Sequence, residues 1–449
     1  MAHQARQVLI IGLDGASPQL VFDRFRSSLP VLSNLIANSI WGELESTLPT
    51  ISVPAWPALV TGRDPGMLGI YGPRQRTEYN YARPSPVTSR SMPHEALWDV
   101  VGRESGASIV IGVPPGYPPQ SVHGVSVSCS LTPEDSPVFT SPPDLSDQIN
   151  RWVGHYQFDV RHHRADAGAS TLQASAHELA VQRFSVLRTL ISTMPWSLAM
   201  LVDVSIDRVQ HAFWHDEELV REHYAVIDRQ IEQTLALVDS QTVVAVVSDH
   251  GARASRGGFA INDWLIREGL LRLQQPLSEA VPLERANVDW AHTTAWAEGG
   301  PTVRLMLNVS GRDHSGTVEP RVYEQLRNEL KRKLEQLVGP DGRIMGTRAY
   351  KPEEIYGATH RVPPDLVCAL GNLAWRGVGT VGHTDLFLPP VPGLSTGNHA
   401  DHGLLALHWP HHGPNGKRQG IRLLDIFPTL LAALDLPQSE GLPGHAIVA

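Results

Sequence analysis

Ionisable side chains that could bind a metal ion follow apolar runs at separate places in the chain. Asp14 follows the run at 8–13, and Asp249 and His250 follow the run at 243–248. Continuous apolar runs are typical of parallel strands buried on both faces, and ligands bind at the carboxyl ends of such strands. Carboxylates and imidazoles are common metal ligands. The pattern therefore predicts a metalloenzyme.

A third apolar run precedes Asp207 and His211. These two residues are four positions apart, so their side chains share one face if the segment is helical. His399, in a Gly-Asn-His sequence, is a further candidate ligand, and its setting just before another apolar run favours it over His402 and His411.

Ser52 is the candidate nucleophile. It lies where a short helix is expected to begin, and free N–H groups at a helix start can hold a phosphoryl group. An ordinary capping role is the alternative, and Thr47 and Thr50 are rival hydroxyls. A serine hydroxyl needs a base or a metal to react, and two divalent ions about 4 Å apart can serve an in-line displacement. The ligand types suit zinc, with manganese as the alternative.

Composition excludes several classes of protein. The chain has 449 residues, a net charge of -9 and two cysteines. The negative charge argues against a nucleic-acid polymer as partner, and two cysteines imply no disulfide framework. The first apolar run is too short for a signal peptide or a membrane span. We expect a cytoplasmic protein without a membrane partner; its oligomeric state is not indicated.

Strands and helices alternate, which predicts an α/β fold: a mostly parallel sheet with helices on both faces. We expect the catalytic core at 1–255 and 395–449 and an inserted smaller α+β subdomain at 256–394. The turn-rich segment 63–93 is expected to be a surface excursion near the site. Helices are expected at 17–38, 95–101, 171–191, 217–238, 320–338 and 425–434.

Several motifs, in order, resemble the alkaline phosphatase superfamily, and most closely its type I phosphodiesterase/nucleotide pyrophosphatase branch. The resemblance spans nearly the whole chain, with the inserted region least covered. Its motifs are Gly12-Leu13-Asp14-Gly15, Ser52-Val53-Pro54, Thr61-Gly62-Arg63-Asp64-Pro65, Asp207-Arg208-Val209-Gln210-His211, Ser248-Asp249-His250-Gly251, Gly397-Asn398-His399 and Asp425-Ile426-Phe427-Pro428-Thr429.

The resemblance implies an alkaline phosphatase-like fold and two divalent metal ions. One metal would be held by Asp14, Ser52, Asp249 and His250. The other would be held by Asp207, His211 and His399. Ser52 would form a covalent phosphoryl-enzyme that water then cleaves.

The resemblance also implies hydrolysis of a small-molecule phosphate ester, with diesters preferred. A phosphomonoesterase or phosphoryl mutase is the alternative, and a binding protein without turnover is a third. Three positions differ from the nucleotide pyrophosphatase pattern: Ser52 replaces Thr, Ala55 replaces Asn and Leu68 replaces His. These differences give no support for a nucleotide as substrate. Ala55 and Trp56 also stand where sulfatases carry a Ser-Arg pair, which argues against a sulfatase.

Overall fold

The centre of the computed structural model, which describes residues 7–104, 106–160, 169–412 and 415–447, is a ten-stranded sheet. β1 (Val8–Leu13) pairs in parallel with β8 (Leu198–Asp203) on one side and β9 (Val243–Val247) on the other. All three strands are fully buried, as their uninterrupted apolar sequences predict.

The parallel part of the sheet continues from β8 through β5 (Ser108–Ile111) to β6 (Gly124–Val127). On the other side, β21 (His402–His408) pairs antiparallel with β9 and with β2 (Ile40–Glu45). Short edge strands complete the sheet: β7 (Thr140–Ser141), β22 (Gly416–Lys417) and β23 (Ile421–Arg422).

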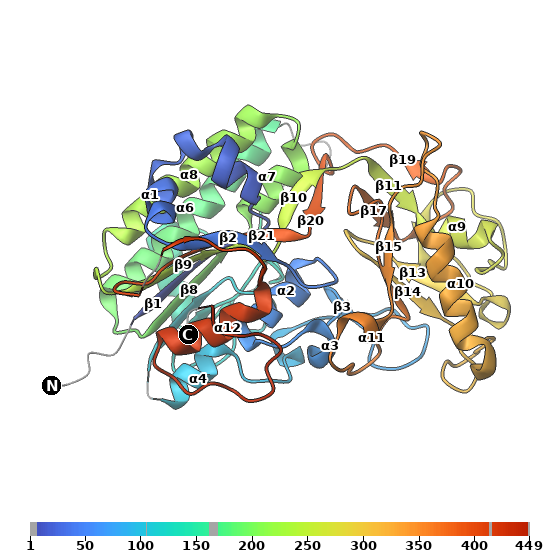
Figure 1. Cartoon of the computed structure of the whole chain (residues 1–449), viewed down its shortest axis with the longest axis horizontal. Coiled ribbons are helices and arrows are strands. Elements are labelled where there is room, and N and C mark those ends of the chain that lie inside the picture. The colour runs from blue at the N-terminus through green and yellow to red at the C-terminus, as the bar shows by residue number, and fades with distance from the viewer. Residues whose placement is uncertain (1–6, 105, 161–168, 413–414, 448–449) are drawn as a thin grey trace.

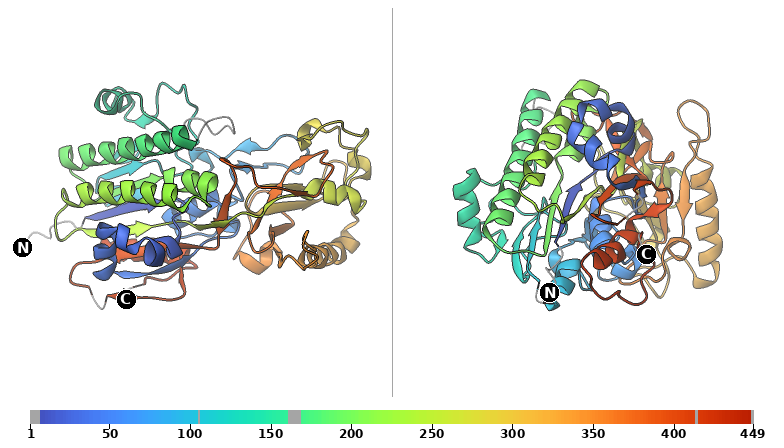
Figure 2. Two further views of the ribbon diagram at one scale, coloured as in Figure 1. Left: turned by 90° about the horizontal axis from the view of Figure 1, so that it is seen from above. Right: turned by 60° about the vertical axis from the view of Figure 1, so that its left-hand side comes forward.

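Helices cover both faces of this sheet (Figures 1 and 2). One face carries α1 (Pro30–Ala37), α6 (Ala169–Thr193), α7 (Ser205–Phe213) and α8 (Glu217–Leu235). The other carries α2 (Ser52–Thr61), α4 (Leu97–Arg103) and α12 (Ile426–Ala433). The predicted α/β class with a mostly parallel sheet is confirmed.

The helical segment expected over 17–38 is present but divided. The chain forms a π-helical turn at Leu20–Arg24 and a 3₁₀ turn at Arg26–Ser28 before α1 begins. Pro30 is the first residue of α1, and because proline disfavours helical backbone in the residue before it, a new helix starts there. Strand β2 follows; it was not predicted, although its sequence alternates between buried and more exposed residues.

The region after β9 forms a second body with its own hydrophobic cluster, drawn from residues between Phe259 and Val381 (Figure 1). It contains an antiparallel sheet in the order β13-β14-β16-β15, flanked by helices α9 and α10. The bounds are β13 Ala295–Glu298, β14 Val303–Leu307, β15 Arg348–Tyr350, β16 Leu366–Ala369, α9 Ile261–Arg267 and α10 Tyr323–Glu335.

The chain leaves the main sheet through β10 (Gly251–Ala254) and returns through β20 (Gly397–Ala400), and these two strands pair antiparallel. A smaller sheet beside them holds β11 (Gly257–Ala260), β17 (Trp375–Val378) and β19 (Phe387–Leu388). The division of the chain at 256 and 394 stays a prediction.

The turn-rich segment 63–93 is built in part from α3 (Pro65–Leu68), β3 (Arg74–Gln75) and β4 (Ser85–Pro86). Tyr81 in this segment stacks on Trp290, with ring centroids 3.9 Å apart. The segment therefore packs against the second body, where it helps to wall a cavity described below.

Within the described residues, no helix has the length and apolar character needed to cross a membrane. Cys129 and Cys368 are both buried free thiols.

Candidate active site

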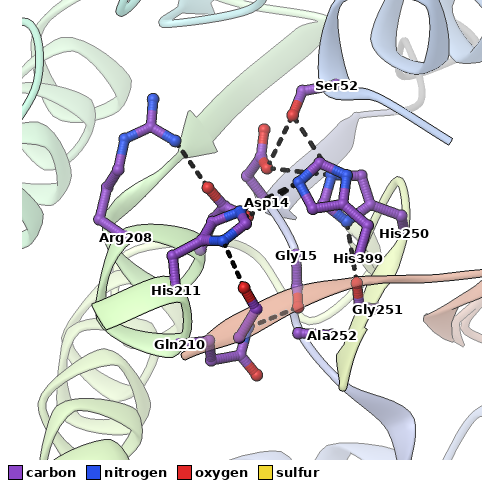
Figure 3. A network of polar contacts seen from close by, with 12 residues as sticks. Asp14, Gly15, Ser52, Arg208, Gln210, His211, His250, Gly251, Ala252 and His399 are labelled. Carbon is purple, nitrogen blue, oxygen red and sulfur yellow. Dashed lines mark hydrogen bonds and ion pairs between the residues drawn. The ribbon is translucent and has the colours of Figure 1, made fainter. Parts of the chain in front are cut away.

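The candidate residues meet at the carboxyl ends of β1, β8 and β9. Figure 3 shows Asp14, Ser52, His211, His250 and His399 close together. Asp14 directly follows β1, and Asp249 lies two residues after β9. Helix α7 begins two residues after β8 and carries Asp207 and His211. Because these strands are neighbours and run in parallel, their ends bring together residues that are far apart in the sequence.

One group of side chains surrounds Ser52. The Ser52 Oγ lies 3.1 Å from Asp14 Oδ1 and 3.3 Å from His250 Nε2. His250 Nε2 in turn lies 3.4 Å from Asp249 Oδ2. The structure thus brings together the four residues predicted to surround one metal.

Ser52 does not act as a helix cap. The N-cap of α2 is Ile51, and no side chain caps the helix; Ser52 is the first helical residue, with its hydroxyl directed at Asp14. The rival Thr50 hydroxyl bonds the Thr47 carbonyl instead. In the described chain, Ser52 is the only one of these three hydroxyls that contacts Asp14.

A second group contains Asp207, His211 and His399. His211 Nε2 lies 3.3 Å from Asp207 Oδ1, as their shared helical face predicts, and His399 Nε2 lies 3.7 Å from the same oxygen. The two Nε2 atoms are 3.1 Å apart. His399 is buried, whereas the alternative His402 is exposed.

His250 lies between the two groups. Its ring stacks on His399 at a centroid distance of 3.7 Å. Two triads have ligand atoms within 4.8 Å of one another: Asp14, Asp249 and His250, and Asp207, His250 and His399. The first triad lies within one predicted ligand set. The second contains His250 where the prediction has His211, so His250 is close enough to contribute to either group.

The donor chemistry of both groups fits cations. The Nδ1 atoms of His211 and His399 lie 3.0 and 2.8 Å from the carbonyl oxygens of Gly397 and Thr50. A carbonyl only accepts, so each neutral ring carries its proton on Nδ1 and its lone pair on Nε2. The two lone pairs then face each other, an arrangement that a cation between them stabilises. Carbonyl-held imidazoles of this kind are typical of metal sites.

The carboxylates indicate the same need for positive charge. Burial raises the pKa of Asp14, and the nearby Asp207 raises it further. Burial and Asp14 raise the pKa of Asp249 well above its usual range. Burial also acts to raise the pKa of Asp207, but His211 and Arg208 hold it well below its usual range. Asp249 Oδ2 is buried and has no hydrogen-bond partner in the described structure. A bound cation would reduce the electrostatic repulsion between the carboxylates of Asp14, Asp207 and Asp249.

Sequence reasoning gave no positioning role to two side chains that hold the carboxylates. The buried Trp56 donates from Nε1 to Asp14 Oδ2 at 2.8 Å. Arg208 donates from Nη1 to Asp207 Oδ2 at 2.6 Å and is held by two further bonds to Asp159. Trp56 lies four residues after Ser52, about one helical turn along α2, so the two side chains share a face of the helix. This spacing is the sequence signal that could have placed Trp56 near Asp14.

Gly15 permits the close approach of α7 to β1. Its φ is +70°, and a Cβ there would lie 2.9 Å from Asp207 Oδ1. Glycine adopts this conformation without penalty, and its N–H donates to Asp249 Oδ1 at 3.2 Å. Gly15 therefore allows Asp207 of the second group to lie close to Asp14 and Asp249 of the first group.

The site opens into a cavity of about 340 Å³, lined by Ser52, Asp14, Asp207, His211 and His399 among others. Ser52 is half-buried and reaches this space. The arrangement can hold cations beside a hydroxyl that a small ligand can approach.

The mostly parallel sheet with helices on both faces, and the Asp and His side chains at its strand ends, are the features expected of a hydrolase in the alkaline phosphatase superfamily. A family profile described as type I phosphodiesterase/nucleotide pyrophosphatase matches residues 8–404. The chain belongs to this family, and it is an enzyme that hydrolyses phosphoric esters. No curated protein sequence matches the chain significantly.

Solved structures show the same fold. Phosphonoacetate hydrolase from Sinorhizobium meliloti 1021, in complex with phosphonoformate, aligns with a TM-score of 0.64 at 14% identity, over 96% of this chain and 95% of that chain. Murine ectonucleotide pyrophosphatase/phosphodiesterase 5, in complex with AMP, aligns with a TM-score of 0.57 at 14% identity, over 98% of this chain and 97% of that chain.

Proposed function

We propose that this enzyme is a phosphodiesterase that uses Ser52 as nucleophile and two divalent metal ions. The observation that carries the proposal is the Ser52 hydroxyl, which is free of any capping role and lies 3.1 Å from Asp14 and 3.3 Å from His250. The preference for diesters rests on membership of the phosphodiesterase family.

Asp14, Ser52, Asp249 and His250 would hold one ion, and Asp207, His211 and His399 the other. The mixed oxygen and nitrogen ligands suit Zn²⁺, with Mn²⁺ as the alternative. When bound, the ions supply Lewis-acid stabilisation of the attacking and leaving oxygens.

The proposed reaction consists of two displacements. Ser52 Oγ loses its proton as it attacks phosphorus, and the P–O bond to the leaving alcohol breaks. The departing alkoxide takes up one proton, which balances the one lost by Ser52, and Ser52 becomes a phosphoryl ester. Water then attacks the same phosphorus, releases a phosphate monoester and returns a proton to Ser52 Oγ. The backbone N–H groups of Ser52 and Val53, in the first turn of α2, have no partner within the helix and would be available to phosphoryl oxygens.

A phosphomonoesterase or phosphoryl mutase of the same superfamily is the alternative. Bis-p-nitrophenyl phosphate and p-nitrophenyl phosphate, each assayed with added Zn²⁺ or Mn²⁺, separate the two esterase activities. We expect the higher kcat/KM for the diester. A higher value for the monoester would overturn the diester preference.

Substitution of the nucleophile tests the covalent route. We expect Ser52→Ala to lose measurable turnover while metal analysis still finds bound ions, because Asp and His ligands remain. Thr47→Val is the matched control: it removes a buried hydroxyl that has no partner in the described structure, outside the site. Turnover in Ser52→Ala at the wild-type rate would exclude a covalent serine intermediate.

A further inference from the structure

A second, larger cavity adjoins the proposed active site. It has a volume of about 700 Å³, and the segment 73–84 and the second body form much of its wall. Pro73, Arg376 and Leu394 line both this cavity and the smaller one that contains Ser52. A molecule whose phosphorus lies at Ser52 can therefore extend past these three residues into the larger space.

Arg376 lies where the two cavities join, on a strand that is paired on both sides. It lies in β17, where Trp375 and Gly377 are buried and Arg376 is half-buried. Its register partner in β11 is Gly258. On the other side, Gly377 exchanges backbone hydrogen bonds of 2.8 and 2.9 Å with Gly300. The backbone around Arg376 is thus fixed from both sides.

The guanidinium of Arg376 has neither a hydrogen bond nor an ion pair within the described part of the chain. Burial lowers its pKa, with no carboxylate to offset the loss of water. A guanidinium carries five N–H donors and suits carboxylate or phosphate oxygens, so a half-buried one without a partner is a ready anion site.

The other arginines of the larger cavity differ because each has a partner. Arg304 donates to Glu298 Oε2 at 3.1 Å and to the Thr302 carbonyl at 3.2 Å. Arg74 and Arg83 lie 3.8 and 3.6 Å from Glu284. Arg76 donates to the Asn80 carbonyl and lies over the Trp296 ring. Among the described arginines of this cavity, Arg376 is the one whose guanidinium has neither a hydrogen bond nor an ion pair.

An apolar wall lies in the same cavity. Trp290 and Trp296 meet edge to face at 5.1 Å, and Tyr81 stacks on Trp290. Leu394 and Val391, also in the lining, are 37% and 42% exposed, so both present apolar surface to the cavity. This surface suits a bulky organic group, and a small phosphonate such as phosphonoacetate would leave most of the space empty.

We infer that Arg376 binds a second anionic group of the substrate, a carboxylate or phosphate, while the substrate's organic portion lies against Trp290, Trp296 and Leu394. This inference rests on the proposed function for the position of the reacting phosphorus. It assigns the substrate class: phosphate esters that carry a bulky organic group and a further negative charge.

Matched diesters test the inference. Phenyl p-nitrophenyl phosphate and its 3- and 4-carboxyphenyl analogues release the same chromophore and differ only in one carboxylate. We expect the wild-type enzyme to have a higher kcat/KM for one of the two carboxylated diesters than for phenyl p-nitrophenyl phosphate, mainly because KM is lower. In Arg376→Gln that preference falls about tenfold to a hundredfold, the range of a charge-assisted hydrogen bond. Equal ratios in the two proteins overturn the inference.

A control and a second readout complete the experiment. Arg332→Gln removes an exposed arginine of α10 whose side chain donates to Gln336, and should keep the wild-type ratio. Calorimetric titration with phenylphosphonate and 4-carboxyphenylphosphonate needs no turnover. If Arg376→Gln binds 4-carboxyphenylphosphonate more weakly than the wild type does, but binds phenylphosphonate equally well, the anion site is supported. Failure of the enzyme to cleave either diester would contradict the diesterase activity and not the anion site. Equal affinities in both proteins overturn the site.

Discussion

The Nε2 atoms of His211 and His399 lie 3.1 Å apart, although the two residues are separated by 188 positions in the chain. Both rings are fixed from behind by backbone carbonyls, so their lone pairs converge. Together with the buried carboxylates of Asp14, Asp207 and Asp249, this convergence makes the metal-free site electrostatically unfavourable.

Chelation should therefore destabilise the protein. We expect EDTA to lower the Tm and Zn²⁺ to restore it, because a ligand at about a hundred times its Kd stabilises by about 2.7 kcal/mol per site. Differential scanning calorimetry measures the shift. In Asp249→Asn the shift should shrink, and in Asp23→Asn, an exposed carboxylate outside the site, it should stay as in the wild type. An EDTA shift of zero in the wild type would contradict a resident metal.

Trp56 should matter through Asp14. Trp56→Phe keeps most of the buried ring but removes the Nε1 donor 2.8 Å from Asp14 Oδ2. Loss of a bond that orients a ligand typically costs about 10–100-fold in metal affinity or activity. We expect kcat to fall by that amount in a phosphodiester assay, with a small change in KM. Trp98→Phe, in a buried tryptophan of α4, should leave kcat near the wild-type value.

Arg208 should increase the affinity for the proposed second ion, because it holds Asp207 in place. Its three hydrogen bonds tie Asp207 to Asp159, and glutamine cannot make all of them. Arg208→Gln is expected to lower metal occupancy at limiting Zn²⁺ by about tenfold or more, measured by competition with a chromogenic chelator. Arg208→Lys should restore part of the occupancy through its charge. Arg221→Gln, an arginine of α8 paired with Glu218, is the control, and equal occupancy in all variants would contradict the role.

Much of the site could be predicted from the sequence because its signals are local. Asp14 and Asp249 end long apolar runs, and Asp207 and His211 are one helical turn apart. The sequence around His399 favours it over His402, and of these two residues His399 is the one that lies in the cluster.

The remainder depends on tertiary contacts that leave no local pattern. The bond of Trp56 to Asp14 spans 42 positions, and that of Arg208 to Asp159 spans 49. Arg376 lies in a region without motifs, and its lack of a partner is a property of the folded cavity. The break before α1 is different, because Pro30 marks it in the sequence.

A buried histidine outside the metal groups should make stability depend on pH. His223 is fully buried on α8 and lies 2.7 Å from Ser205 Oγ. Burial, with a smaller contribution from His177, lowers its pKa from 6.5 to about 3. Below pH 6.5 the unfolded chain binds a proton at His223 that the folded chain does not. The stability that comes from keeping His223 neutral in the folded protein is therefore present above pH 6.5 and is lost as the pH falls toward 3.

We expect the free energy of unfolding to fall by about 2 kcal/mol more between pH 7 and pH 5 in the wild type than in His223→Gln. Urea unfolding in EDTA at both pH values measures the difference while keeping bound metal out of the comparison. Gln241→Asn, at an exposed residue that does not titrate, should show the wild-type pH dependence. The same fall in both wild type and His223→Gln would mean that His223 takes up its proton without unfolding.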